Sequence, residues 1–529
     1  MSTAFITVQT QTAPEPSMPS IDDAAVGFAP TGLLIDGAFV EAGSGRTLDV
    51  EDPATGQPIA RVADADPDDC VRALDAAVRA QSSWARSAPR ERARILRRAA
   101  DRARAEIDTL AMILTLEMGK PLAESRSEVE FAAEYIEWFA DEAPRISGRI
   151  QGAPDGASTH LVVKSPVGPC LVITPWNFPV AVPARGIAPA LAAGCTVVLR
   201  PSSLTPLSAL ALAKIFVESG VPAGVLNVVV SSIDGATDPL VVDPRLRRLT
   251  FTGSEPVGRH LIALGAEQVV RVSVELGGCA PAIVCADADL DVAVDGVLAA
   301  KMRNGGEACT AANRIYVHRS VVEEFTRRLA ARVAGIRIGR GTRTGIGLGP
   351  MISARHQERL GELVADATAR GARVVCAGGV VPGDGHFFAP VVLADVPDGA
   401  RVMREEIFGP IAPISTFEDD DEVIARANDC PHGLAAYLFT RDLERAMRMG
   451  ALIEAGMIGI NRGRVSCATA PFGGVKHSGY GHSGGAEGID EYLVTRYLSM
   501  PDPTASSECQ TGDGLALRRR RVDAPVAHD

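Results

Sequence analysis

The chain has no long hydrophobic run. Nowhere among its 529 residues do about eighteen apolar residues follow one another, which excludes a membrane-spanning helix of ordinary length. The first segment, residues 1–30, also lacks lysine and arginine. It therefore has neither the basic start of a secretory signal peptide nor the arginines of a transit peptide. These absences predict a cytoplasmic protein that makes no contact with a membrane.

Basic residues are in the minority. The chain carries 53 lysines and arginines against 65 aspartates and glutamates, a formal net charge of −12. Because the phosphate backbone of a nucleic acid would be repelled by this charge, we expect no nonspecific binding to DNA or RNA. The ten cysteines include no pair with two residues between them and no regular spacing. This distribution predicts neither a disulfide framework nor a zinc site, and we expect no metal requirement.

The chain does contain an alternation of helical and strand patterns. Residues 66–145 predict long amphipathic helices, one of them over 89–110 with a proline at the first helical position. From about residue 167, helical segments such as 207–219 separate short apolar runs. Four of these runs are predicted to be buried strands: 171–174, 196–199, 226–230 and 249–252. Strands buried on both faces and separated by helices predict an α/β fold with a doubly wound parallel sheet of the kind that binds dinucleotides.

One cysteine lies in a setting suited to a nucleophile. Cys309 is surrounded by small residues and glycines within 302–314, which leaves room for a carbonyl group beside the sulfur. A thiolate adds readily to an aldehyde, and the thiohemiacetal can then lose hydride to a nicotinamide. Upstream, Glu275 offers a carboxylate and Asn177 an amide that could donate to an oxyanion. Taken singly, the cysteine also fits a small buried apolar residue, and the other two fit ordinary turns.

In this order and spacing, the three segments resemble those of the aldehyde dehydrogenase superfamily. The resemblance extends from about residue 32 to residue 500, and it is greatest for the succinate-semialdehyde dehydrogenases. It implies that Cys309 attacks the aldehyde carbon while the Asn177 side chain and the Cys309 backbone N–H hold the oxyanion. Glu275 would then activate the water that hydrolyses the thioester.

The resemblance also implies a domain organisation. A dinucleotide-binding domain would comprise 31–143 and 166–277, and the α/β catalytic domain would comprise 278–477. A small β arm, 144–165 and 478–502, would join subunits into a homodimer or homotetramer. The extensions 1–30 and 503–529 are expected to be disordered.

The cofactor site has no glycine-rich fingerprint, because no G-x-G-x-x-G follows a strand. Instead, residues 251–258 run from a strand end into a helix start, where backbone amides can hold a pyrophosphate. In isolation this segment would also fit a plain strand–helix turn. The resemblance implies a pyrophosphate-binding role, and it places Glu406 and Phe408 at the nicotinamide ribose and ring. The residues expected to bind the cofactor are Thr174, Pro175, Trp176, Arg200, Ser202, Ser203, Gly253, Ser254, Gly258, Leu276, Glu406 and Phe408.

One cofactor segment departs from the family pattern. Where many relatives carry lysine and, three positions later, glutamate, this chain has Arg200 and Ser203. A glutamate there would repel a 2′-phosphate, whereas Arg200 can pair with phosphate in bidentate fashion. We therefore expect NADP to be preferred, with NAD as the second cofactor. The alternative is that Arg200 only ends the strand and that both cofactors bind.

Three further positions indicate the substrate. Arg185, Arg303 and Ser466 match the residues that bind the distal carboxylate in succinate-semialdehyde dehydrogenases. Two arginines beside an apolar aldehyde would be costly to bury without an acid partner, so they favour a short acid-aldehyde. Either arginine alone would also fit a surface ion pair. Arg462 and Arg464, where relatives carry small or apolar residues, leave the chain length of the substrate open.

The sequence thus predicts NAD(P)-dependent oxidation of succinate semialdehyde to succinate. One alternative is another short acid-aldehyde, such as glutarate semialdehyde. A second is a CoA-acylating enzyme, against which the presence of Glu275 argues because this residue serves hydrolysis. A third is a non-catalytic protein on the same scaffold, which would be expected to have lost Cys309, Glu275 or Asn177.

Overall fold

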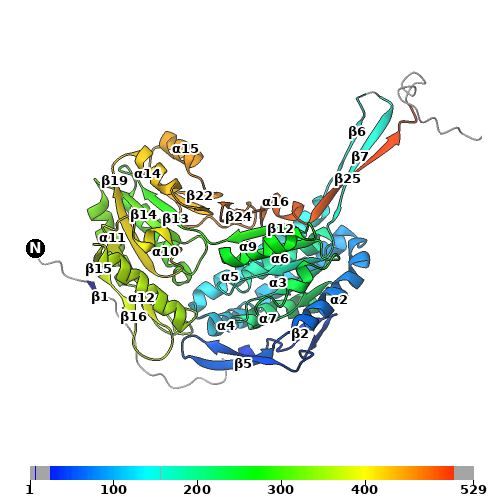
Figure 1. Cartoon of the computed structure of the whole chain (residues 1–529), viewed down its shortest axis with the longest axis horizontal. Coiled ribbons are helices and arrows are strands. Elements are labelled where there is room, and N and C mark those ends of the chain that lie inside the picture. The colour runs from blue at the N-terminus through cyan, green and yellow to red at the C-terminus, as the bar shows by residue number, and fades with distance from the viewer. Residues whose placement is uncertain (1–5, 8–23, 155, 505–529) are drawn as a thin grey trace, which may run out of the picture. The chain divides into compact units, whose positions relative to one another are not determined.

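The structure is a computed structural model that describes residues 6–7, 24–154 and 156–504 (Figure 1). By their contacts, the residues form two compact units. The larger comprises the described residues within 1–145 and 166–493, and the smaller comprises those within 146–165 and 494–504. Within the described ranges, none of the helices is long and apolar enough to cross a membrane.

The larger unit contains an eight-stranded sheet in the order β24-β12-β11-β8-β9-β10-β2-β3, and all of its strands except β24 come from residues before 277. Its five central strands run parallel: β12 (Arg271–Leu276), β11 (Arg248–Gly253), β8 (Cys170–Ile173), β9 (Val197–Arg200) and β10 (Leu226–Val228). Antiparallel strands close the edges: β24 (Gly479–Tyr480), β2 (Leu33–Ile35) and β3 (Ala38–Val40). The predicted doubly wound parallel sheet and its four strands are confirmed.

Helices cover this sheet in two groups, which is why its central strands are apolar on both faces. The first group is α3 (Pro89–Ala105), α4 (Ile107–Met118), α5 (Leu122–Glu142), α6 (Ala181–Ala193), α7 (Pro206–Glu218) and α16 (Gly485–Asp490). The second is α2 (Pro67–Ala85), α8 (Asp238–Val241) and α9 (Glu255–Ala266). The helix predicted over 89–110 is interrupted at Glu106, which ends α3 and begins α4. The interruption lets α4, apolar on most of its surface, turn into the core.

A second eight-stranded sheet has the order β1-β15-β18-β19-β14-β13-β21-β22. Its strands are β1 (Ile6–Thr7), β15 (Arg373–Ala377), β18 (Val391–Ala394), β19 (Ile411–Phe417), β14 (Ala312–His318), β13 (Ala280–Val284), β21 (Ala435–Phe439) and β22 (Met457–Ile460). From β18 to β22 all pairings are parallel. Its helices are α10 (Leu290–Met302), α11 (Val322–Ala334), α12 (Ala354–Ala369), α13 (Arg401–Arg404), α14 (Asp420–Asn428) and α15 (Leu443–Leu452). Residues 277–279 connect β12 of the first sheet to β13 of the second.

Among the described residues, three two-stranded antiparallel sheets and two 3-10 turns complete the larger unit. They are β4 (Thr47–Asp52) with β5 (Gln57–Ala63), β16 (Gly379–Val380) with β17 (Phe388–Ala389), β20 (His432–Gly433) with β23 (Val475–Lys476), η1 (Ala143–Arg145) and η2 (Arg303–Gly306).

The smaller unit contains a three-stranded sheet in the order β25-β7-β6, formed by β25 (Leu493–Pro501), β7 (Ser158–Pro166) and β6 (Arg149–Gly152). Most of its side chains are partly or fully exposed, among them Ile150 and Tyr497. An isolated sheet this small buries too little apolar surface to be stable alone.

The structure differs from two predicted boundaries. Residues 478–492, predicted to join the arm, belong to the larger unit, because β24 pairs with β12 and α16 contacts α6. Residues 24–30, predicted to be disordered, are ordered: Ala25 and Ala29 are buried, and the Lys214 ammonium lies 4.0 Å from the centre of the Phe28 ring. The predicted tail lies outside the described residues from 505 onward.

Candidate active site

The first sheet brings four loops to one edge. Because β8, β9, β11 and β12 are parallel, the segments that follow them emerge together at their carboxyl ends. The chain moves from β8 to β9 on one side, and β11 lies on the other side of β8. This reversal is a topological switch point, where open α/β sheets bind ligands.

The loop that carries Cys309 has an unusual backbone. It follows η2, in which Asn304, Gly305 and Gly306 all have positive φ. At Gly306 a side chain could not fit, since a Cβ would lie 2.3 Å from the carbonyl oxygen of Gly409. Asparagine tolerates positive φ better than most residues, and two sets of donors hold Asn304 in this conformation. Its backbone N–H donates to Glu124 Oε2 at 2.7 Å, and its side-chain N–H₂ donates to backbone oxygens. The turn therefore fixes the direction from which Cys309 enters the site.

A cavity of about 270 Å³ lies between these loops. Thirteen of the eighteen predicted site residues line it: Pro175, Trp176, Asn177, Arg185, Gly253, Ser254, Glu275, Leu276, Arg303, Cys309, Glu406, Phe408 and Ser466. Thr174, Arg200, Ser202, Ser203 and Gly258 are not among its lining residues. The structure thus brings the predicted nucleophile, carboxylate and amide together with the predicted cofactor and substrate residues.

Cys309 and Asn177 are neighbours within this cavity. Burial raises the pKa of the Cys309 thiol to about 11, and the nearby Arg185 guanidinium opposes this shift. The Asn177 side chain is buried, and its amide donates to the carbonyl oxygen of Glu307 at 3.0 Å, two residues before the cysteine. The backbone carbonyl oxygen of Asn177 accepts a hydrogen bond from Lys120 Nζ at 2.8 Å. The amide N–H₂ therefore has a fixed position beside Cys309, with a second hydrogen left to donate.

Glu275 is buried at the end of β12 and has two partners. Its carboxylate is paired with the Arg185 guanidinium and accepts a hydrogen bond from the Ser483 hydroxyl. Burial raises its pKa, while Arg185 and Ser483 oppose the rise. Arg185 also lies over the Phe472 ring, 4.2 Å from its centre. The charge of Arg185, a residue predicted to bind the substrate carboxylate, is thus balanced by Glu275 within the chain itself.

Arg303, unlike Arg185, is not paired with a carboxylate of the described residues. Its guanidinium donates to Thr310 Oγ1 at 3.3 Å and lies 5.2 Å from the centre of the Phe178 ring. Across the described ranges, none of the ion pairs within 4 Å involves Arg303. The cavity therefore has one cation without a carboxylate partner at its wall. Ser466 lines the same cavity.

A second cavity of about 670 Å³ shares Phe131, Phe178 and Arg303 with the first. Arg332, Arg337 and Arg464 also line it. The Arg464 guanidinium lies 4.9 Å from the centre of the Phe131 ring, whereas Arg462 lines neither cavity. The wall of this cavity therefore carries both basic side chains and the carboxylates of Glu124, Glu128 and Asp295.

The other end of the first cavity suits a dinucleotide. Ser254 precedes α9 without capping it through its side chain, so the first-turn N–H groups of that helix remain available to an anion. Gly258 lets α9 approach β12 closely, since a Cβ would lie 2.5 Å from Leu276. The buried Thr174 hydroxyl has no hydrogen-bond partner among the described residues. Free donors and a close backbone approach are the features that a pyrophosphate requires, so the residues present fit the cofactor.

Aromatic and acidic groups close this end. The Trp176 and Phe408 rings meet edge to face, 5.4 Å between centres, and His356 donates to the Phe408 carbonyl oxygen at 2.6 Å. Glu406 accepts from the Gly278 N–H at 3.1 Å, and burial raises its pKa to about 7. Sequence reasoning missed His356, because nothing in its local sequence distinguishes it from a surface residue at a helix start.

The predicted NADP residues lie next to this region at the end of β9. Arg200 Nη2 donates weakly to the carbonyl oxygens of Ser231 and Ile233, at 3.3 and 3.4 Å. Its Nε has no partner among the described residues. Ser202 Oγ accepts from the Leu204 N–H at 3.2 Å, and Ser203 is half-buried.

Sequence reasoning also missed part of the cavity wall. These residues, which come from α5, α6, α12, β11 and loops, are Phe131, Tyr135, Phe178, Ala181, Val182, Thr252, Gly277, Thr310, His356 and Phe472. Most are apolar or aromatic, and their periodic patterns are those of ordinary core residues. Only the fold turns them toward the cavity.

The aldehyde dehydrogenase family profile matches residues 39–498. A succinate-semialdehyde dehydrogenase of Paenarthrobacter nicotinovorans is 52% identical over 446 residues, 84% of this chain and 99% of the relative. An NADP(+) succinate-semialdehyde dehydrogenase of Escherichia coli (strain K12) is 46% identical, covering 88% and 97%. A glutarate-semialdehyde dehydrogenase of Pseudomonas aeruginosa is also 46% identical, covering 88% and 96%.

The fold is similar to that of solved structures as well. The crystal structure of a succinate-semialdehyde dehydrogenase from Burkholderia pseudomallei aligns with a TM-score of 0.89 at 45% identity, covering 90% of this chain and 99% of that one.

Proposed function

The chain belongs to the aldehyde dehydrogenase family, and on that basis we propose that it oxidises succinate semialdehyde to succinate. The observation that carries the choice of substrate is Arg303, a cation without a carboxylate partner at the wall of the cavity that contains Cys309. A partly buried guanidinium is stabilised by an acid partner, and a short aldehyde with a terminal carboxylate would supply one.

Cys309 is the proposed nucleophile. Its thiolate adds to the aldehyde carbon and forms a thiohemiacetal. The Asn177 amide, with a second hydrogen left to donate, and the Cys309 backbone N–H stabilise the oxyanion. Burial works against ionisation of the thiol, and the guanidinium of Arg185 works in its favour.

Glu275 is the proposed general base for hydrolysis of the thioester. Its raised pKa suits the uptake of a proton from water. Arg185 and Ser483 hold both carboxylate oxygens, so one of these contacts has to yield when a water molecule is activated. A substrate carboxylate near Arg185 would compete for the guanidinium and release Glu275. In this proposal Arg185 serves both the base and the substrate.

A nicotinamide dinucleotide, when bound, supplies the acceptor for the hydride that leaves the aldehyde carbon. We propose that the α9 start with Ser254 holds the pyrophosphate, that Glu406 binds the nicotinamide ribose, and that Phe408 contacts the ring. NADP is the proposed preference. It is supported by Arg200, by the absence of an acid at Ser203 and by the NADP(+) relative from Escherichia coli.

Glutarate semialdehyde is the second candidate substrate. It is supported by the relative from Pseudomonas aeruginosa, and its extra methylene would carry the carboxylate further from the sulfur. The second cavity beyond Arg303, with Arg464 at its wall, offers room for it. A CoA-acylating reaction has weaker support, because Glu275 lies in the same cavity as Cys309 and favours water as the acceptor.

We further propose a cytoplasmic homodimer or homotetramer. The nine cysteines that the structure describes are all free, as in a reducing compartment. The three-stranded sheet of the smaller unit exposes apolar side chains that subunit contact would bury.

A panel of short aldehydes tests the proposal. Propanal, butanal, succinate semialdehyde and glutarate semialdehyde would each be assayed with NAD and with NADP, with and without CoA. We expect kcat/KM to be highest for succinate semialdehyde with NADP and unchanged by CoA. A preference for uncharged aldehydes would refute the substrate assignment, and equal use of both dinucleotides would refute the cofactor preference.

A further inference from the structure

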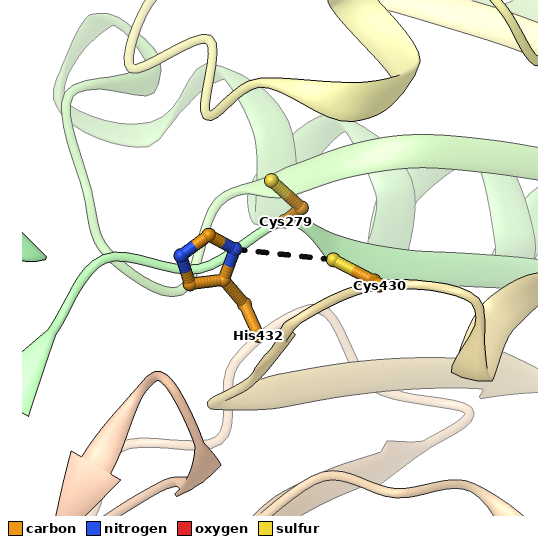
Figure 2. A group of neighbouring side chains, drawn as sticks. All are labelled: Cys279, Cys430 and His432. Carbon is orange, nitrogen blue, oxygen red and sulfur yellow. Dashed lines mark hydrogen bonds between the residues drawn. The ribbon is translucent and has the colours of Figure 1, made fainter.

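Two cysteines and a histidine meet at a place that the proposed reaction does not use (Figure 2). Cys279 lies in the connection between β12 and β13, while Cys430 and His432 lie between α14 and β21. One ligand atom from each, the two Sγ atoms and an imidazole nitrogen, lie within 4.8 Å of one another. None of the three side chains lines the cavity that contains Cys309.

The imidazole is oriented by a carboxylate. His432 Nε2 lies 3.0 Å from Glu255 Oε2, and Nδ1 faces Cys430 Sγ at 3.9 Å. A carboxylate that accepts from one ring nitrogen leaves the lone pair on the other, here Nδ1 toward the sulfurs. This arrangement of carboxylate, histidine and cation orients the ligands in many metal sites.

The backbone that carries the sulfurs is held in place by Arg314. This buried guanidinium donates to the carbonyl oxygens of Cys279 at 2.9 Å, Arg426 at 3.0 Å and Ala427 at 2.8 Å. Cys279 is thereby linked to the segment that leads into Cys430. A small cavity of about 10 Å³, lined by Cys279 and His432 among others, lies beside the cluster.

We propose that Cys279, Cys430 and His432 bind a zinc-type divalent cation. In a tetrahedral site with Zn–S of about 2.3 Å and Zn–N of about 2.0 Å, ligand atoms lie roughly 3.6–3.8 Å apart. The ligand atoms, now up to 4.8 Å apart, would therefore move toward one another by at most about 1 Å on binding. The two thiols release their protons to solvent on binding, so that two thiolates neutralise the cation, and the fourth position takes a water molecule.

The site adjoins the proposed cofactor end of the active site. Glu255 follows Ser254 and begins α9, and the residue before Cys279, Gly278, donates its N–H to Glu406. A bound cation would therefore tie the β12–β13 connection to the start of α9. Cation binding by these three side chains does not depend on which aldehyde the enzyme oxidises.

Titration with Co²⁺ under reducing conditions tests the proposal. The Cys309→Ala protein serves as the background, since the proposed nucleophile could itself bind the probe. We expect close to one equivalent of Co²⁺ with thiolate-to-cobalt absorption and a four-coordinate visible spectrum. Cys279→Ser and Cys430→Ser should each weaken binding by at least about tenfold and reduce the thiolate absorption. His432→Gln should weaken binding but keep that absorption.

The control is Cys376→Ser, which alters another buried cysteine on β15 and should leave the titration unchanged. Glu255→Gln leaves all three ligands intact and should lower affinity about 10- to 100-fold, so it also serves if a cysteine variant fails to fold. The proposal would be overturned if the Cys309→Ala background and its Cys279, Cys430 and Glu255 variants all bound Co²⁺ with the same affinity and the same absorption. A six-coordinate spectrum without thiolate absorption would overturn it as well.

Discussion

Arg185 and Arg303 have the same charge at the same cavity, yet their surroundings differ. Arg185 is paired with Glu275, whereas Arg303 has only neutral partners. A substitution of Arg185 would therefore disturb the proposed base together with the substrate contact. Arg303 is the cleaner probe of substrate charge.

We predict that Arg303→Gln raises KM for succinate semialdehyde by one to two decades. The reason is the loss of a charge-assisted contact of roughly 1.5–3 kcal/mol. KM for butanal should change little, because butanal never made that contact. Arg462→Gln, an exposed arginine that lines neither cavity, is the matched control and should leave both constants unchanged. An equal rise for both aldehydes would show that Arg303 supports the fold instead.

The pH dependence of Cys309 follows from its burial. Only the thiolate is alkylated, and the pKa of the thiol is raised to about 11. In the free enzyme, alkylation of Cys309 by iodoacetamide should therefore accelerate about tenfold per pH unit between pH 7 and 9. Peptide mapping by mass spectrometry follows this cysteine alone. Arg185→Gln should slow the reaction at each pH, since its guanidinium lowers the pKa. A plateau near pH 8 would contradict the effect of burial.

At the level of elements, a buried ion pair positions the loop that carries Asn177. Glu128 of α5 is paired with Lys120, and it accepts from the N–H groups of Val180 at 2.9 Å and Ala181 at 3.1 Å, where α6 begins. Lys120 in turn donates to the backbone carbonyl oxygen of Asn177. The pair thus connects the start of a helix with a proposed catalytic residue.

Glu128→Ala should lower the free energy of unfolding by about 3–5 kcal/mol, because it leaves Lys120 as an unpaired buried charge. It should also lower kcat as Asn177 loses a support. Denaturant unfolding and steady-state kinetics measure the two effects. Glu130→Ala on the same helix breaks an exposed pair with Arg104 and should cost no more than about 1 kcal/mol. Similar losses in both variants would indicate that the buried pair has no special role.

Helices and strands themselves were largely predictable. The strands β8, β9, β10 and β11 are short and uniformly apolar, so their pattern depends only on burial on both faces. The break between α3 and α4 at Glu106 was not predictable, since no proline or glycine marks it. Tertiary packing of α4 produces it.

For the whole molecule, the proposed assembly depends on the smaller unit. Ile150 on β6 is 73% exposed in this chain, which is costly for a large apolar side chain unless a second subunit covers it. Ile150→Asp should at least halve the average mass found by sedimentation velocity. Val269→Asp, at a position that is 88% exposed on the larger unit, is the control and should leave the mass unchanged. An undiminished mass for Ile150→Asp would exclude this sheet as the subunit contact.

The sequence by itself determined the fold class and the order of Asn177, Glu275 and Cys309, because these depend on local patterns and on motif spacing. Through the resemblance to the aldehyde dehydrogenases it also indicated thirteen residues that line the cavity, and some of them follow parallel strands that deliver their loops to one edge. Only the tertiary structure decided which groups are paired. The contact of Arg185 with Glu275, the support of Asn177 by Lys120, and the meeting of Cys279 with Cys430 and His432 join distant segments. Such contacts depend on how elements pack and leave no periodic signal in the chain.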